Sequence, residues 1–246
     1  MSQLCVATPY SRSHYGGYVR SLLFMDTRDG VEYIDPFGMA LDQARNYIVE
    51  AFLAGGAEYL LMVDNDATFH RGAAQRLMDH NLPMVCGCMY TTGVPPKPTM
   101  GLYSGKAANE KHYYSFAKVA QEIISTARLE LGEELPKENA LLFREARLMM
   151  VDGCGMHFAM IRRDVLATVR PPWFVFTGDR AGGEDFYFCR KVREAGFPIY
   201  VDLSVHTGHA TGEREGADFG LRELLTCAQY MPVENLVDVE TENWEV

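Results

Sequence analysis

Apolar residues in the first ninety positions follow two alternating patterns, short runs and a repeat of three and four. Short runs closed by a polar or turn residue predict β-strands in "LCVATPY", "AEYLLMVDND" and "LPMVCGCMY". Between them, "GMALDQARNYIVEAFLAGG" and "RGAAQRLMDH" have helical spacing, and Gly55 with Gly56 ends the first helix. Strand, helix, strand, helix, strand is typical of a parallel sheet with helices on its faces. The pattern therefore predicts an α/β fold.

The second half of the chain is less regular. "TTGVPPKPTMGLYSG" is rich in proline and glycine and predicts a loop, whereas "SFAKVAQEIISTARLELGEEL" predicts an amphipathic helix that ends near Pro136. "EARLMMVDGCGMHFAMIRRDVL" predicts strands around a Gly-x-Gly turn and then the start of a helix. "GGEDFYFCRKVREAGF" predicts a glycine turn and a helix ended by Gly196, and "PIYVDLSV" predicts a further strand. We expect one α/β domain with an inserted helical element and a tail.

Composition places the chain among ordinary globular proteins. Its 246 residues are 48% hydrophobic and 23% charged, enough for a sizeable core. No apolar stretch reaches the ~18 residues of a membrane span, and "MSQLCVATPY" lacks the features of a secretory signal. The six cysteines show no framework spacing, so we expect a reduced, cytoplasmic protein with no membrane partner. Cys86 and Cys88 form a C-x-C pair that could bind a metal, but the apolar run "MVCGCMY" around them favours a buried strand.

The net charge constrains the ligands. At −10 it argues against non-specific nucleic-acid binding, and a phosphate-bearing ligand would need a cation or a local basic patch. Part of the acidic excess lies in residues 232–246, which contain five acids and no lysine or arginine. That stretch is typical of a solvated tail.

Two acids one residue apart follow the strand predicted in "YLLMVDNDAT". In a strand, residues two apart point to the same side, so Asp64 and Asp66 would face together beyond its carboxyl end. Ligands of open α/β sheets bind at that edge. Paired carboxylates there suit a divalent cation such as Mg²⁺ or Mn²⁺, which would offset the charge of a diphosphate. The alternative is a turn in which Asp64 or Asn65 caps the following segment.

A second pair of acids, Glu184 and Asp185, follows Gly182 and Gly183 at the start of a predicted helix. The helix dipole favours acids at this position, which is the structural explanation. The functional alternative is a carboxylate aimed at a substrate hydroxyl and acting as general base. The two glycines would then let a substrate approach the backbone closely.

Two further motifs lie late in the chain. His209 in "VHTGHA" follows a strand in a predicted loop, where imidazole could bind a first-row divalent metal or simply be solvated. His206 is a competing candidate. Gly153 and Gly155 in "VDGCGMHFAMIRR" would permit a backbone turn against a ligand.

Taken in order, these elements resemble a known family. A strand ending in Thr-Pro-Tyr, a helix with "ARN", a D-x-D, a glycine loop, a Gly-Glu-Asp and a late Gly-His resemble a GT-A glycosyltransferase of the broad family 2 type. The resemblance covers roughly residues 4 to 210, is closest to compact phage- and prophage-encoded members, and is most specific in "GGEDFYFCRKVREAGFPIYVDLSVHTGH". For a phage protein, the compartment would be the host cytoplasm.

The resemblance implies a fold and a domain plan. The expected fold is a single GT-A (Rossmann-like) domain with a mostly parallel central sheet and helices on both faces. This domain would occupy residues 1–215, with a helical insertion at about 106–145. A C-terminal helix and acidic tail would follow over residues 216–246.

The resemblance also implies roles for single residues. The cofactor would be Mn²⁺ or Mg²⁺ and the donor a nucleotide sugar, with UDP as the expected nucleotide. Asp185 would be the general base and Glu184 would assist in positioning substrate. Thr8, Pro9 and Tyr10 would receive the base, and Arg45 and Asn46 would lie near the nucleotide or its phosphates. Asp64 would contact the ribose or the metal, and Asp66 and His209 would bind the metal. Gly153 and Gly155 would lie beside donor and acceptor.

The acceptor and the reaction class stay open at this point. Base catalysis from the far side of the sugar would invert its configuration. The acceptor is a modified base in phage DNA or a glycan, and residues 144–193 carry nine basic and six acidic side chains, a local charge of +3. The alternatives are a nucleotidyltransferase, which "ATPYSRSHYGGYVR" with Arg12 does not exclude, and a non-catalytic sugar- or nucleic-acid-binding module.

Overall fold

A computed structural model describes most of the first 209 residues. The helix predicted at 115–135, apart from its first residue, and the predicted tail at 216–246 lie outside this part, so the domain plan stays a prediction. Side chains are not described at positions 103–106 and 112–115 or at His206. The described ranges are 3–10, 13–26, 30–89, 99–106, 112–115, 148–177 and 183–209.

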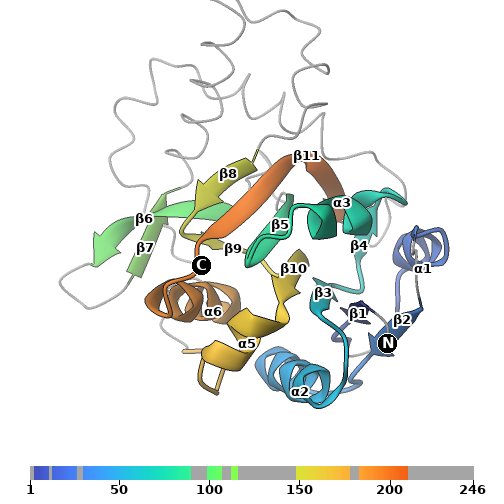
Figure 1. Ribbon diagram of the computed structural model, residues 1–246, viewed down its shortest axis with the longest axis horizontal. Coiled ribbons are helices and arrows are strands. Elements are labelled where there is room, and N and C mark those ends of the chain that lie inside the picture. The colour runs from blue at the N-terminus through green and yellow to red at the C-terminus, as the bar shows by residue number, and fades with distance from the viewer. Residues whose placement is uncertain are drawn as a thin grey trace, which may run out of the picture.

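The centre of the molecule is an eight-stranded sheet of order β2-β1-β3-β10-β5-β11-β4, with β8 paired to β11 (Figure 1). Five strands run in one direction, and β10, β4 and β8 run in the other. The predicted mostly parallel sheet is confirmed. The strands are β1 (Leu4–Ala7), β2 (Val31–Ile34), β3 (Tyr59–Val63), β4 (Ala67–Phe69), β5 (Met84–Cys88), β8 (Leu148–Val151), β10 (Phe158–Arg162) and β11 (Ile199–His209).

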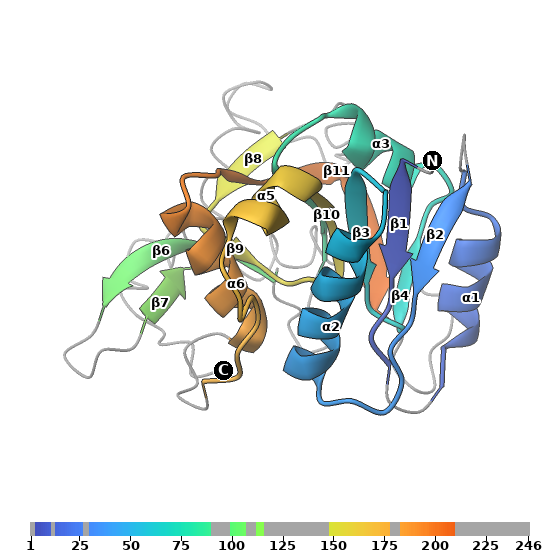
Figure 2. The same ribbon diagram turned by 60° about the horizontal axis from the view of Figure 1, so that its bottom comes forward.

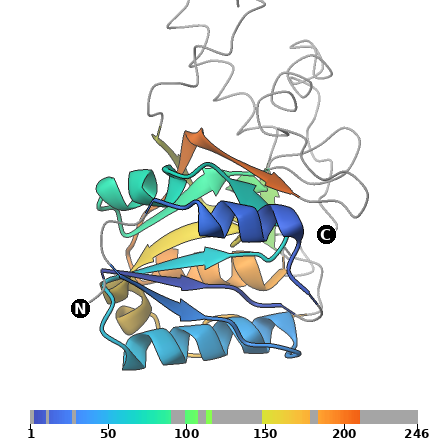
Figure 3. The ribbon, with the colours of Figure 1, turned by 90° about the vertical axis from the view of Figure 1, so that its right-hand side faces the viewer.

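Helices cover both faces of this sheet, as predicted (Figure 3). On one face, α2 (Leu41–Ala54), α5 (Arg163–Thr168) and α6 (Gly183–Glu194) bury a core that includes Ile48, Phe52, Leu166 and Phe188. On the other face, α1 (Gly16–Leu23) and α3 (Ala73–Asp79) bury Tyr18 and Leu77 against the strands. The sheet is thus the middle of three layers, and the edge formed by the ends of its strands is exposed.

A small second sheet of order β7-β6-β9 lies beside the first (Figure 2). It contains β6 (Met100–Lys106), β7 (His112–Ser115) and β9 (Gly153–Cys154). The prediction of a loop over 91–105 is therefore wrong from residue 100 onward, because β9 supplies a partner strand from far along the chain. The region predicted as a helical insertion also contains a strand, β7, near its beginning.

Besides β6 and β7, three further elements were not predicted: α1, β2 and β4. Their places matter, because β2 and β3 pair with opposite sides of β1. The chain leaves β1 towards β2 on one side and leaves β3 towards β4 and β5 on the other, so the carboxyl ends of β1 and β3 form a topological switch point, where open α/β sheets bind ligands.

Helix α2 is held at its carboxyl end by Arg163. The guanidinium of Arg163 donates hydrogen bonds to the carbonyl oxygens of Phe52 (2.9 Å), Leu53 (3.2 Å), Gly55 (3.1 Å) and Ala57 (2.6 Å). The last carbonyls of a helix lack partners within the helix, so a cation is favourable there. This clamp fixes the position of α2, whose other half reaches the site described below.

Across the described ranges, no helix is both long enough and apolar enough to cross a membrane.

Candidate functional site

The two aspartates of the D-x-D motif lie in a turn beyond β3. The backbone N–H of Ala67 donates to the carbonyl of Asp64 at 3.0 Å, so the chain turns here and does not continue as a strand. The argument from strand alternation is therefore wrong, and the alternative of a turn is correct for the backbone. The two carboxylates nevertheless converge on one histidine. The Nδ1 atom of His157 lies 3.7 Å from Asp64 Oδ2 and 3.8 Å from Asp66 Oδ1.

His157 was not predicted as a site residue. It directly precedes β10, which runs antiparallel to β3, so it reaches the same edge as the end of β3. Its side chain is 2% exposed. Its Nε2 lies 3.2 Å from the carbonyl oxygen of Gly208, and since a carbonyl only accepts, we assign the ring hydrogen to Nε2.

That assignment leaves the lone pair of Nδ1 pointing at two carboxylates. Nδ1 is buried and has no hydrogen-bond partner among the residues that the structure describes. A lone pair facing negative oxygens is unfavourable unless a proton or a cation lies between them. The environment of His157 thus fits a bound cation.

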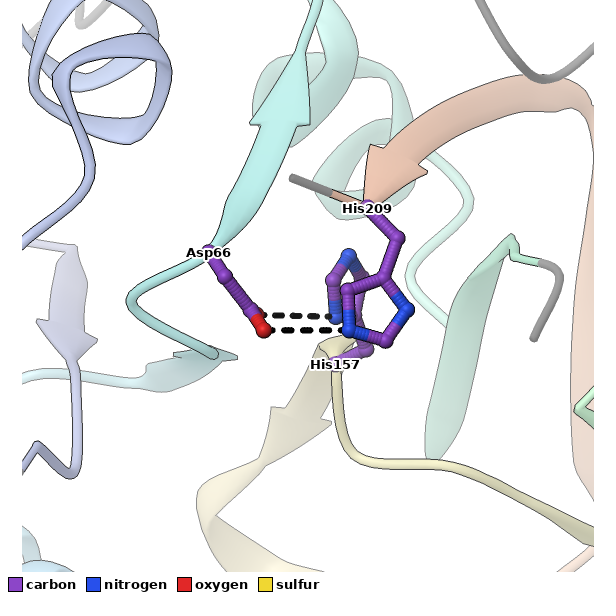
Figure 4. Close-up of side chains that lie close together, drawn as sticks. All are labelled: Asp66, His157 and His209. Atoms are coloured by element: carbon purple, nitrogen blue, oxygen red, sulfur yellow. Dashed lines mark hydrogen bonds and ion pairs between the residues drawn. The ribbon is translucent and has the colours of Figure 1, made fainter. Parts of the chain in front are cut away.

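Three possible ligands meet at this point: Asp66, His157 and His209 (Figure 4). One ligand atom from each lies within 4.8 Å of the others, and His209 Nε2 is 3.0 Å from Asp66 Oδ2. One carboxylate and two imidazoles suit a first-row transition ion such as Mn²⁺ better than Mg²⁺, which prefers oxygen ligands. The structure therefore places the predicted ligands Asp66 and His209 together and adds His157.

The surroundings of His209 differ from those expected. It is the last residue of β11 and not part of a loop, because β11 continues past its bend to pair with β4. For His206, the structure describes only the backbone, which pairs with Cys88. Cys86 and Cys88 are buried in β5, as predicted.

Arg45 from α2 lies beside this cluster and is 1% exposed. Its Nη2 donates to Asp64 Oδ1 at 3.0 Å, and its Nη1 donates to Glu184 Oε1 at 2.6 Å and to Asp185 Oδ1. Burial opposes the charge of Arg45, but the three carboxylates outweigh it and raise the pKa of Arg45. Burial would likewise raise the pKa of Asp64, yet the charge of Arg45 outweighs it and holds that pKa well below its usual range. Both groups are therefore charged.

Glu184 and Asp185 differ in access. The side chain of Glu184 is 5% exposed, whereas that of Asp185 is 24% exposed, so Asp185 is the carboxylate with more access to a ligand. Asp185 Oδ2 also accepts from the backbone N–H of Met156 at 3.3 Å. A Cβ atom at Gly155 would lie 3.6 Å from the same oxygen, so the glycine loop packs directly against this carboxylate.

The other predicted contacts are placed as follows. Gly153 lies in β9, paired with Gly101. Asn46 accepts from the backbone N–H groups of Trp173 (2.8 Å) and Phe174 (3.2 Å) and donates to the carbonyl of Phe174 (2.6 Å). It therefore braces a loop on α2, and a contact to the nucleotide remains a prediction.

The residues after β1 divide into buried and accessible groups. Thr8 and Pro9 are buried, and Thr8 Oγ1 is 2.6 Å from the hydroxyl of Tyr18. Tyr10 is half-buried, and its ring centroid lies 4.0 Å from that of His14 and 5.2 Å from that of Phe37. Phe37 is 62% exposed. An accessible aromatic surface therefore lies at the switch point, and only Tyr10 of it was predicted.

The buried carboxyl of Glu184 predicts a pH effect on stability. Burial, and next the carboxylate of Asp185, raises the pKa of Glu184 to about 7 from 4.5, against the charge of Arg45. Between these values the folded protein binds more protons than the unfolded chain, so the free energy of unfolding should fall as pH rises from about 4.5 to about 7. We expect a fall of ~1–3 kcal/mol, measured by urea unfolding across this range.

Glu184→Gln should flatten this dependence, because glutamine does not titrate. Glu194→Gln changes an exposed glutamate at the other end of α6 and should keep the slope of the parent protein. An unchanged slope in Glu184→Gln would contradict the assignment.

Comparisons with known proteins bear on the fold. No family model and no curated protein matches the sequence. Among solved structures, A197 from STIV is similar with a TM-score of 0.56 and 18% identity, over 86% of this chain and 87% of that one. GalNAc-T7 solved with UDP, GalNAc and Mn²⁺ is similar with a TM-score of 0.51 and 10% identity. The chain has a GT-A-like fold.

At these identities the likeness establishes the GT-A-like fold alone. The match to GalNAc-T7 covers 93% of this chain but 48% of that chain, so it concerns about half of the other protein. The narrower resemblance to phage- and prophage-encoded members stays a prediction.

Proposed function

We propose that this GT-A-like protein is a metal-dependent glycosyltransferase, which moves a sugar from a nucleotide-sugar donor to a hydroxyl acceptor. The observation that carries the proposal is the cluster of Asp66, His157 and His209, with the buried Nδ1 of His157 facing carboxylates. The GT-A-like fold supports it, since GalNAc-T7 has this fold and was solved with UDP, GalNAc and Mn²⁺.

The metal would be held by Asp66, His157 and His209, with Asp64 facing it or the ribose. When bound, a divalent cation neutralises charge that develops on the departing nucleoside diphosphate. A protein of net charge −10 needs such compensation to hold a diphosphate. The two imidazoles favour a first-row transition ion over Mg²⁺, and we propose Mn²⁺, the ion with which GalNAc-T7 was solved, and UDP as the nucleotide.

The donor base would lie at the carboxyl end of β1, where Thr8, Pro9 and Tyr10 follow the strand. The rings of Tyr10 and Phe37 offer an accessible aromatic surface on which a base could stack. Gly153 and Gly155 would lie beside donor and acceptor.

Asp185 would take the proton from the acceptor hydroxyl as the hydroxyl attacks the anomeric carbon of the donor. Its partial exposure and its position against the glycine loop support this role. Attack opposite to the departing diphosphate inverts the anomeric configuration. Glu184 is too buried to meet substrate and would act through Arg45 and Asp185.

For the acceptor, we propose a modified base in DNA or a glycan. The local charge of +3 over residues 144–193 is compatible with a phosphate backbone. A glycan would need only the polar and aromatic groups at the edge of the sheet.

A donor-hydrolysis screen tests the proposal. UDP-, GDP- and dTDP-sugars are incubated with the full chain, with and without Mn²⁺, and release of the nucleoside diphosphate is measured. We expect release from a UDP-sugar that depends on Mn²⁺. Consumption of a nucleoside triphosphate with release of pyrophosphate would instead indicate a nucleotidyltransferase. Binding of a sugar or nucleic acid without turnover of any donor would indicate a binding module.

A further inference from the structure

Arg45 is a buried cation at the junction of two parts of the site. It extends from the first half of α2, whose far end is clamped by Arg163. Its guanidinium lies 5.8 Å from the ring centroid of Phe174, and Asn46 next to it fixes the backbone of the same loop. Arg45 is therefore held by its own helix and by a neighbouring loop.

The three carboxylates bound by Arg45 come from distant segments. Asp64 belongs to the turn that carries the metal ligand Asp66, whereas Glu184 and Asp185 begin α6. Among the described residues, no other arginine or lysine lies within ion-pair distance of these three carboxylates, and the imidazole of His157 lies near Asp64. The guanidinium of Arg45 thus bridges the metal turn and the start of α6.

We propose that Arg45 is a positioning residue, which holds the carboxylate of Asp185 at a fixed place relative to Asp64 and the metal turn. The inference rests on the proposed function for the role of Asp185, but the contacts themselves do not. It departs from the role that the family resemblance implies for Arg45, contact with the donor nucleotide or phosphates. A side chain that is 1% exposed and bound to three carboxylates has little surface left for a phosphate.

The geometry of the guanidinium explains why arginine is needed here. Two separate nitrogens of the guanidinium serve the two sides, Nη2 for Asp64 and Nη1 for the pair on α6. A lysine ammonium is a single point and cannot span both sides in this planar arrangement. Arg45→Lys should therefore keep the charge but lose the alignment.

A thermal-unfolding series on the metal-free chain tests the contacts without any substrate. Arg45→Met should lower Tm by about 10 °C, because it leaves three converging acids, one of them buried, without their shared cation. Adding Glu184→Gln to Arg45→Met should recover a large part of this loss, since the buried charge is removed. Arg45→Met and Asp185→Asn should also be non-additive in Tm, as expected for side chains in direct contact.

A kinetic series then separates positioning from mere stability. With Mn²⁺ present and the donor concentration varied, Arg45→Met/Glu184→Gln should keep a donor KM near that of the parent while kcat falls about 100-fold. The kcat of Arg45→Lys should fall similarly. The matched control is Arg76→Met, which removes an arginine on α3, on the other face of the sheet, that pairs with the buried carboxylate of Asp202 at 2.8 Å. It should lower Tm but leave kcat at temperatures below its Tm unchanged.

The outcomes are distinct. Additive Tm changes would overturn the inference whether or not the protein turns over a donor. Recovery of kcat together with Tm in Arg45→Met/Glu184→Gln would overturn it by showing a purely structural role. A raised donor KM with normal kcat would overturn it in favour of contact with the donor. Absence of turnover in the parent protein would count against the proposed function, and the Tm series would still decide whether Arg45 links the three carboxylates.

Discussion

Replacing His157 with alanine should weaken Mn²⁺ binding by about 100-fold or more, although no sequence motif marks this residue. The Nδ1 of His157 is buried, has no hydrogen-bond partner in the described part of the chain, and faces Asp64 and Asp66 at 3.7 and 3.8 Å. A cation placed there gains a nitrogen ligand and relieves the unfavourable contact of a lone pair with carboxylates. Asp66→Ala should have a comparable effect. The affinity is measured by isothermal titration calorimetry or from the electron paramagnetic resonance signal of free Mn²⁺.

The control for this experiment is His70→Ala. His70 is an exposed histidine just after β4, and its Nδ1 is turned towards the backbone N–H of Gly72. It should leave the affinity for Mn²⁺ unchanged. If His157→Ala bound Mn²⁺ as tightly as the parent protein, the metal centre described above would be wrong.

Asp185→Asn should lower kcat by about 10²–10⁴-fold while Mn²⁺ binding stays intact. The amide keeps the size of the carboxylate and can still accept from Met156, but it cannot take a proton from an acceptor hydroxyl. The side chain lies outside the group of three metal ligands, so the loss should appear in the chemical step. The measurement is the rate of sugar transfer or donor hydrolysis at saturating donor and Mn²⁺.

Asp152→Asn provides the comparison for this substitution. Asp152 lies just before the glycine loop and pairs with Arg193 at 3.0 Å, away from Arg45. It should retain the kcat of the parent protein. A normal kcat in Asp185→Asn would exclude Asp185 as the base.

The fold was predictable where burial left a clear pattern in the sequence, either an unbroken apolar run or a helical period. Strands β1, β3 and β5 are buried at every position, and α2 places Ile48, Val49 and Phe52 on one face. The missed elements lack such a signal. Strand β2 has no fully buried residue, β4 spans three residues, and α1 begins in two glycines without a side-chain cap. Their formation depends on neighbours that the local pattern does not reveal.

Two of the three candidate metal ligands followed from motifs, and the third followed only from the topology. Asp66 stands in a D-x-D and His209 in a late Gly-His, so both were predicted as ligands. His157 stands in neither motif and follows the Gly-x-Gly of Gly153 and Gly155. A usable signal was present, because a polar imidazole directly before the apolar run "FAMI" must find a partner when that run is buried.

For Arg45, the sequence predicted the position near the site but not the contacts. Its place near the site was predicted from "ARN", but its burial and its three carboxylate partners were not. Two of these partners lie about 140 positions further along the chain. Local spacing carries no information about such a contact.

The reversed direction of β10 has a consequence for how this edge of the molecule could diversify. Because β10 runs against its neighbours β3 and β5, the residues that come before it, and not those after it, arrive beside the ends of the other strands. Residues 152–157, which include β9, form the short connection from β8 to β10 and bring His157 beside the aspartate turn. A change in the length of this connection would therefore move His157 relative to Asp64 and Asp66, so this connection and the aspartate turn can only vary together.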